Sequence, residues 1–211
     1  MTELEKLNKD IEENYLQKFE IVDKNQIISS EREQNTIDHM LSIFNGKVEN
    51  KKILDIGCNF GLFSVMLTWM KAKCTGIDPN EKAIEIANRV KDYLGLKINY
   101  VLGKFTKEWL SKKKFNYIIC TSCYHYLWGH FKNHDEIFKL FHGTGADIFF
   151  EDALDMTDYS CNEYFTKQFP TEKHLYTKEL ILDAAKKYFD LSYMGDHLNG
   201  TRHIYWMKRE K

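Results

Sequence analysis

A glycine-containing segment, Asp55-Ile56-Gly57-Cys58-Asn59-Phe60-Gly61, lies between a short apolar run and a stretch with helical character. The apolar run at residues 53–56 predicts a strand, and residues 62–70 predict a helix. Glycines at such a junction let the backbone turn tightly and let a ligand approach main-chain atoms closely. The segment therefore predicts a strand–loop–helix unit of an α/β protein, with a ligand bound at the loop.

Strand and helix patterns continue to alternate toward the C-terminus. Strands are predicted at 74–78, 98–102, 115–121 and 146–150, and helices at 80–94, 131–141 and 178–188. This alternation is typical of βαβ units, which form a mostly parallel sheet covered by helices on both faces. Two last strands, 191–194 and 204–207, have no helix between them, so they should pair antiparallel. The expected fold is a seven-stranded sheet with one reversed strand.

The first 48 residues are expected to form an N-terminal helical extension, followed by the main domain at 49–211. Apolar residues at a spacing of three to four predict an amphipathic helix over 3–20. Ser30 and Glu33 form a capping-box pattern that predicts the start of a second helix, and Gly46 would end it.

Composition narrows the classes of function. The 211 residues include 30 basic and 31 acidic side chains, a net charge of −1, which offers no general electrostatic attraction to nucleic acid or to an acidic membrane. No uncharged stretch reaches the roughly 20 apolar residues of a membrane span. The N-terminus lacks a signal-peptide pattern, and the five cysteines are expected to be free thiols in a reducing cytoplasm. Nothing in the sequence predicts the oligomeric state.

The loop itself excludes two common nucleotide sites. A dinucleotide fingerprint would need glycine at positions 59 and 62, where this chain has Asn59 and Leu62. A P-loop would need Gly-Lys-Ser/Thr after the loop, and that sequence is absent.

The loop resembles the acidic-x-Gly-x-Gly-x-Gly segment of class I S-adenosylmethionine-dependent methyltransferases, with Asn59 in place of the middle glycine. Asp78 follows Gly61 by 17 residues and ends the second strand, where a carboxylate can accept both ribose hydroxyls. The fourth strand leads into Thr121 and the aromatic residues that follow it, and this stretch also resembles that family. The resemblance implies a Rossmann-like fold, S-adenosylmethionine (SAM) as cofactor, and methyl transfer.

The resemblance also implies a set of residues that contact the cofactor. These are the loop, the end of the second strand, the segment after the third strand and the end of the fourth: Asp55, Gly57, Cys58, Asn59, Phe60, Gly61, Asp78, Pro79, Lys104, Phe105 and Thr121. The family often has an acid after the third strand for the adenine amino group. This chain has Gly103-Lys104 instead, so adenine recognition would fall to backbone groups and Phe105.

The aromatic segment after the fourth strand predicts the acceptor side of the site. His125 is the candidate proton acceptor, because an unperturbed imidazole titrates near neutral pH; packing is the equally weighted alternative. Glu151 is a second candidate catalytic group. Tyr124, Tyr126, Trp128 and Asp152 are candidate substrate contacts. Residues 156–173 are long enough to form a lid, or simply to connect two elements.

The motifs leave the acceptor open. A small molecule methylated on oxygen or nitrogen is favoured over tRNA or an RNA end, because the sequence shows neither an appended RNA-binding domain nor a strongly basic pI. A non-catalytic nucleotide-binding scaffold is the third possibility, disfavoured by the intact loop and Asp78. No metal is expected. Cys120, Cys123, His130 and His134 have zinc-like spacing, but strand residues three apart should point to opposite faces.

Overall fold

The computed structural model describes residues 1–13, 18–111, 113–197 and 200–210. They fall into two compact units, Met1–Phe105 (unit 1) and Thr106–Lys211 (unit 2). Within the described residues, seven strands form a sheet in the order β5-β4-β3-β6-β7-β9-β8. The β3–β4, β4–β5 and β6–β7 pairs are parallel, whereas β9 runs antiparallel to both β7 and β8. The predicted fold class, with its single reversed strand, is confirmed.

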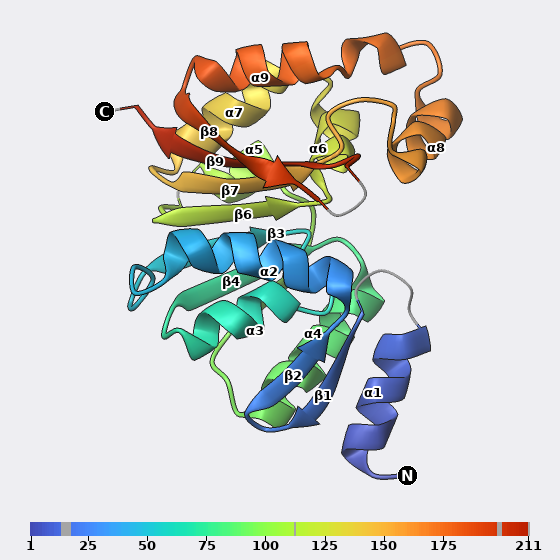
Figure 1. Ribbon diagram of the computed structural model, residues 1–211, viewed down its shortest axis with the longest axis vertical. Helices are drawn as coiled ribbons and strands as arrows, with labels where there is room; N and C mark the ends of the chain where they lie inside the picture. Colours follow the sequence, from blue (N-terminus) through green and yellow to red (C-terminus); the bar gives the residue numbers. More distant parts are fainter. Residues whose placement is uncertain (14–17, 112, 198–199, 211) are drawn as a thin grey trace. The chain divides into compact units, whose positions relative to one another are not determined.

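Unit 1 contains three strands of this sheet together with helices and a separate hairpin (Figure 1). Its elements are α1 Glu3–Glu13, β1 Phe19–Asp23, β2 Gln26–Ser29, α2 Glu31–Phe44, β3 Lys52–Ile56, α3 Leu62–Trp69, β4 Lys73–Asp78, α4 Glu81–Leu94 and β5 Asn99–Leu102. The side chain of Ser30 caps α2, as expected, and that of Asn80 caps α4. Strand β3 is buried over four of its five residues, so it forms the centre of this unit's core.

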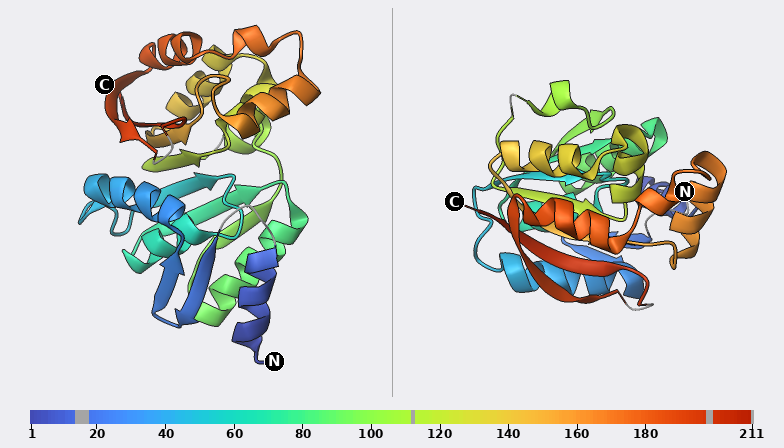
Figure 2. Two further views of the ribbon diagram at one scale, coloured as in Figure 1. Left: turned by 45° about the vertical axis from the view of Figure 1, so that its right-hand side comes forward. Right: turned by 90° about the horizontal axis from the view of Figure 1, so that it is seen from above.

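The prediction of one helix over 3–20 is wrong at its C-terminal end. Helix α1 ends at Glu13, positions 14–17 lie outside the described residues, and Phe19 begins the hairpin β1–β2. The side chain of Asn8 in α1 donates to the carbonyl of Ile21 and accepts from its N–H, both at 2.9 Å. This tertiary pairing fixes the hairpin beside α1 (Figures 1 and 2). The predicted boundary near residue 48 stays a prediction.

Unit 2 contains the other four strands. Its elements are α5 Lys107–Leu110, β6 Tyr117–Thr121, α6 Tyr124–Phe131, α7 His134–Gly143, β7 Asp147–Asp152, α8 Tyr159–Gln168, a 3-10 turn Lys173–Leu175, α9 Lys178–Lys186, β8 Phe189–Asp196 and β9 His203–Arg209. Helices α7 and α9 pack side by side (Figure 1).

Three helices of unit 2, α5, α6 and α8, were not predicted, and the predicted helix over 131–141 begins too early. Phe131 is the last residue of α6, after which Lys132 adopts a left-handed conformation with φ of 57°. Asn133 then caps α7 by accepting from the Glu136 N–H at 3.1 Å. Two short helices therefore meet where one was expected.

Candidate active site

The glycine loop of unit 1 joins β3 to α3 in a series of left-handed turns. Gly57, Asn59 and Gly61 have φ angles of 67°, 49° and 86°. The N–H groups of Gly57 and Cys58 donate to the carbonyl of Ile77 in β4, at 2.9 and 3.2 Å. The loop is therefore anchored to the neighbouring strand by its own backbone. Two of its left-handed positions are glycines, for which this conformation carries no steric cost.

Asp78, the last residue of β4, ties this loop to the start of α4. One carboxylate oxygen accepts from the Asn59 N–H at 3.0 Å, and the other accepts from the Asn80 N–H at 2.8 Å. Burial raises the pKa of Asp78, and these two hydrogen bonds oppose that effect. Each carboxylate oxygen has more than one lone pair, so Asp78 retains acceptor capacity for a ligand.

Two polar side-chain atoms in the loop region are buried without a hydrogen-bond partner among the described residues. They are Oδ1 of Asp55 and Oδ1 of Asn59. The other oxygen of Asp55 accepts from the Ser64 hydroxyl at 2.7 Å. Unsatisfied buried acceptors are rare, and each one left unpaired costs about 1–3 kcal/mol. A ligand with N–H or O–H donors would satisfy both oxygens, which fits the amino and hydroxyl groups of SAM.

The glycine at position 61 is required by a neighbouring tyrosine. A Cβ at Gly61 would lie 2.0 Å from the hydroxyl oxygen of Tyr100, a residue of β5. That hydroxyl donates to the Gly61 carbonyl at 3.3 Å. The close approach of the tyrosine therefore excludes any larger residue at position 61, in addition to the left-handed φ.

We expect Asp55 to make the stability of the protein depend on pH. Burial raises its pKa from 3.8 to about 7, against the opposing hydrogen bonds from Ser64. Because the folded protein holds this proton more tightly than the unfolded chain does, Asp55 contributes stability that is fully present below about pH 4. That contribution is lost as the pH rises to about 7.

Urea unfolding at pH 5 and pH 8 measures this effect by comparing the parent protein with Asp55→Asn. The parent should lose about 2–3 kcal/mol of unfolding free energy more than the variant over this interval. The other titrating groups are common to both proteins, so their contribution cancels in the comparison. Parallel pH dependence in the two proteins would contradict the raised pKa of Asp55.

The remaining predicted cofactor residues lie in different surroundings. Cys58, Phe60 and Phe105 are buried in unit 1, whereas Pro79 and Lys104 are exposed. Thr121 is buried at the end of β6 in unit 2. In unit 1 the structure brings together the loop and Asp78.

In unit 2, His125 and Asp152 form a buried pair. The Nδ1 atom of His125 in α6 lies 2.9 Å from Oδ1 of Asp152, the last residue of β7. The same carboxylate accepts from the N–H groups of Tyr124 and Ala153. An ionised carboxylate only accepts, so Nδ1 carries the proton and Nε2 is left with the lone pair. Asp152 thus orients His125, and its role as a substrate contact stays a prediction.

Aromatic rings surround His125. The ring of Tyr126 lies 4.1 Å from it and that of Tyr164, in α8, lies 5.7 Å from it, centre to centre. Gly129 allows α8 to come this close, because a Cβ there would lie 2.3 Å from the Tyr164 hydroxyl. Tyr126 is 53% exposed, so it borders the solvent, whereas His125 is 2% exposed.

Two predicted substrate residues lie in the core of unit 2. Tyr124 and Trp128 are fully buried among the rings of Phe138, Phe165 and Tyr176. The Tyr124 hydroxyl is paired with Nδ1 of His134 at 2.8 Å. These contacts pack both side chains in the interior, and their role as substrate contacts stays a prediction.

The zinc-like residues also pack in the interior. The sulfur atoms of Cys120 and Cys123 lie 3.5 Å apart. The expectation that they face opposite directions is wrong, because the strand ends at Thr121 and Ser122 turns the chain with φ of 55°. In the described part of the chain, no group of three or more His, Cys, Asp or Glu side chains is arranged to hold a metal ion.

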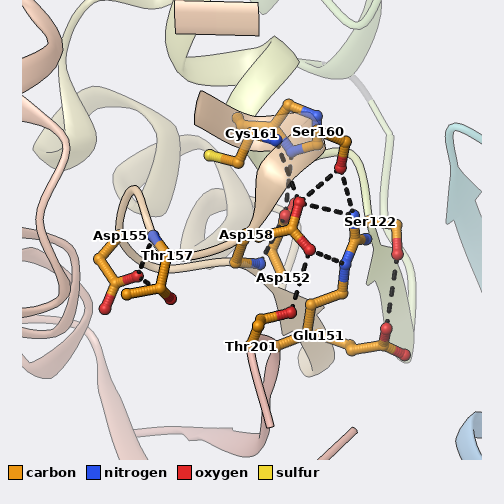
Figure 3. A network of polar contacts seen from close by, with 12 residues as sticks. Ser122, Glu151, Asp152, Asp155, Thr157, Asp158, Ser160, Cys161 and Thr201 are labelled. Carbon is orange, nitrogen blue, oxygen red and sulfur yellow. Dashed lines mark hydrogen bonds and ion pairs between the residues drawn. The ribbon is translucent and has the colours of Figure 1, made fainter. Parts of the chain in front are cut away.

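A second polar network in unit 2 was not predicted from the sequence. Asp158, the N-cap of α8, accepts from the hydroxyls of Ser160 and Thr201 and from Nε of Arg202 at 3.2 Å. Figure 3 shows the Ser160 and Thr201 hydroxyls directed at the Asp158 carboxylate. Burial alone would raise the pKa of Asp158, but these hydrogen bonds and the guanidinium charge hold it well below its usual range.

The third carboxylate of this region is Glu151, the other candidate catalytic group. It is buried in β7, and its Oε1 accepts from the Ser122 hydroxyl at 3.4 Å (Figure 3). The Ser122 N–H also donates to the Glu151 carbonyl at 2.7 Å. Ser122 thus links the end of β6 to β7.

No helix among the described residues is long and apolar enough to cross a membrane.

Comparison with known proteins relates these features to a family. Residues 53–144 match the model of a methyltransferase domain. A ubiquinone biosynthesis O-methyltransferase of Methylocella silvestris is 42% identical over 53 residues, which cover 25% of this chain and 21% of that relative. This chain therefore spans about a fifth of the length of that relative.

Two solved structures share the fold. The magnesium protoporphyrin IX methyltransferase ChlM of Synechocystis, with bound S-adenosylhomocysteine (SAH), has a TM-score of 0.59 and 16% identity, covering 84% of this chain and 83% of its own. The N-methyltransferase NodS of Bradyrhizobium japonicum, also with SAH, has a TM-score of 0.61 and 14% identity, covering 85% and 87%. Residues 53–144 therefore match a methyltransferase domain by sequence, and the chain shares its fold with these two methyltransferase structures.

Proposed function

We propose that this protein transfers a methyl group from SAM to an oxygen or nitrogen atom of a small-molecule acceptor. The observation that carries the proposal is the loop of unit 1. Its two unsatisfied buried oxygens, on Asp55 and Asn59, lie in a turn that Asp78 ties to the next strand. A ligand with a cationic amine and vicinal hydroxyls matches these acceptors.

Each loop residue has a distinct part in binding SAM. Asp55 accepts from the amino group of the methionine part, and Asp78 accepts from the ribose hydroxyls. Gly57 and Gly61 keep the backbone free of side chains where the cofactor passes. Phe105, buried after β5, packs against the adenine. Lys104 and Pro79 are exposed, so we assign them no more than rim contacts.

When bound, SAM supplies an electrophilic methyl carbon, so the protein has only to align the acceptor and exclude water. The chain's contribution on the acceptor side is proton removal. His125 takes the acceptor proton on Nε2, and Asp152 stabilises the imidazolium through its contact with Nδ1, 2.9 Å away. A neutral amine would need only its lone pair exposed, so the orienting of this histidine favours a hydroxyl acceptor.

Two arguments favour a small molecule over RNA. The net charge of −1 offers no general electrostatic attraction to the phosphates of RNA. The curated relative and the two solved structures are also named for small acceptors or for O- and N-methylation. We propose a cytoplasmic location, in keeping with the five free cysteines.

Isothermal titration calorimetry tests the cofactor half of the proposal. The purified protein should bind SAM and SAH and should give no heat with NAD, because positions 59 and 62 lack the glycines of a dinucleotide site. Binding of NAD, or of neither sulfur nucleotide, would refute the assignment.

Labelled methyl transfer into cell-extract fractions tests the acceptor half. The label should appear in a low-molecular-weight fraction and should be insensitive to ribonuclease. Label in a ribonuclease-sensitive fraction would instead assign the protein to RNA modification. SAH binding without any transfer would favour a non-catalytic role.

A further inference from the structure

The guanidinium of Arg202 has one edge engaged and one edge unpaired. Its Nε and Nη2 contact the carboxylate of Asp158 at 3.2 and 3.5 Å, and Nη2 also donates to the Ser160 hydroxyl at 3.0 Å. The group is planar, so the N–H bonds of Nη1 point away from Asp158. Nη1 is buried and has no hydrogen-bond partner among the described residues, in a side chain that is 5% exposed.

The position of Arg202 relates it to the proposed proton acceptor. It immediately precedes His203, the cross-strand partner of Asp152 at the paired ends of β9 and β7. Asp152 in turn contacts His125. Burial alone would lower the pKa of Arg202, but the nearby carboxylates of Asp152, Asp158 and Glu151 raise it. The unpaired donor therefore belongs to the same cluster as the histidine.

An unpaired donor in the interior is costly, and such groups call for an explanation. In unit 1 the unpaired oxygens of Asp55 and Asn59 lie where the cofactor is proposed to bind. Arg202 shows the same property on the acceptor side, but as a donor. Its natural complement is an oxygen atom brought by the acceptor.

The charges of the cluster restrict that oxygen further. One guanidinium lies among three carboxylates, so a fully anionic group would meet net negative charge. A neutral hydroxyl avoids this repulsion, and it can also donate to one of the carboxylates.

We propose that the methyl acceptor is a neutral ring with two adjacent hydroxyls, one deprotonated by His125 and the other held by Nη1 of Arg202. This rests on the proposed function. Nη1 is covered in the structure, so the acceptor displaces a neighbouring side chain to reach it. The half-exposed Tyr126, whose ring lies 4.1 Å from that of His125, is the side chain we assign to this movement.

Calorimetry on the SAH-saturated protein tests the proposal with matched probes. Catechol has two adjacent hydroxyls, phenol has one, and 3,4-dihydroxybenzoate adds a negative charge. A second arm uses trans-1,2-cyclohexanediol and cyclohexanol, which has only one hydroxyl, so that the two arms distinguish an aromatic from a saturated, sugar-like ring. In one arm the ring with two adjacent hydroxyls should bind roughly tenfold tighter than its single-hydroxyl partner, since a hydrogen bond to a charged donor is gained. Dihydroxybenzoate should bind no better than catechol.

Two variants locate the preference on Arg202. Arg202→Lys keeps the charge beside Asp158 but loses the forked donor, so the preference should fall to within about twofold. Thr201→Val removes another donor to the same carboxylate, at 3.1 Å, and should keep the preference. SAH affinity should be unchanged in both.

Three results would overturn the inference: no preference in either arm, tighter binding of dihydroxybenzoate than of catechol, or an undiminished preference in Arg202→Lys. The probe series on the parent protein decides the matter even if the lysine variant does not fold. Failure of the parent protein to bind SAH would instead refute the proposed function. The failure of this inference and the failure of the proposed function are therefore distinguishable.

Discussion

Replacing His125 with alanine is expected to lower the turnover number by roughly 10²–10⁴-fold, the range for loss of a general base. The reason is that Nδ1 is held by Asp152 at 2.9 Å, which leaves Nε2 as the proton acceptor. SAH affinity should be unchanged, because the loop and Asp78 belong to unit 1. The measurement is labelled methyl transfer to the acceptor found in extract fractions, with calorimetry for SAH.

Two further variants separate catalysis from packing. His130 is an exposed histidine on the same helix α6, so His130→Ala should keep normal turnover. Asp152→Asn removes the charge that orients and stabilises the imidazole, and it should reduce turnover in the same direction. Normal turnover with a lowered melting temperature in His125→Ala would show that the histidine only packs.

The sheet was predictable because its signals are local. The apolar runs that became β3, β4, β6 and β7 are contiguous, and the cap at Ser30 is recognised from Glu33, three positions later. Turn-forming glycines such as Gly57 and Gly61 likewise act on their own backbone. Features of this kind need no knowledge of distant residues.

The missed elements depend on tertiary contacts. Hairpin β1–β2 is fixed by the Asn8 side chain, which pairs with Ile21 13 residues away. Helix α6 contains aromatic residues on several sides because it packs against α7 and α8, so its sequence shows no simple amphipathic period. Local patterns do not contain this information.

The candidate site likewise has one part that was predictable from the sequence and another that depended on tertiary contacts. The loop of unit 1 was recognised as a motif, whereas the pairing of His125 with Asp152 spans 27 residues and required the fold. Arg202 had no sequence signal at all. An arginine between a glycine and a strand is usually a surface residue, and only its burial and its contact with Asp158 distinguish it.

Replacing Asp78 with alanine is expected to weaken SAH binding by at least about tenfold, the effect of losing even one charge-assisted hydrogen bond. Each hydrogen bond from a ribose hydroxyl to a carboxylate contributes about 1.5–3 kcal/mol, and the substitution removes both. The carboxylate also holds the N–H groups of Asn59 and Asn80, at 3.0 and 2.8 Å, so the loop itself loses an anchor.

Calorimetry with SAH, together with a melting curve, separates these two effects. Asp78→Asn keeps the size of the side chain and one carbonyl acceptor, so its melting temperature should stay closer to that of the parent while its SAH affinity still falls. Asp92→Ala removes an exposed carboxylate from the nearby helix α4 and should alter neither property. An unchanged dissociation constant in Asp78→Ala would place the ribose elsewhere. A loss of affinity restored in Asp78→Asn would mean that the loop anchor, and not the negative charge, is what the cofactor requires.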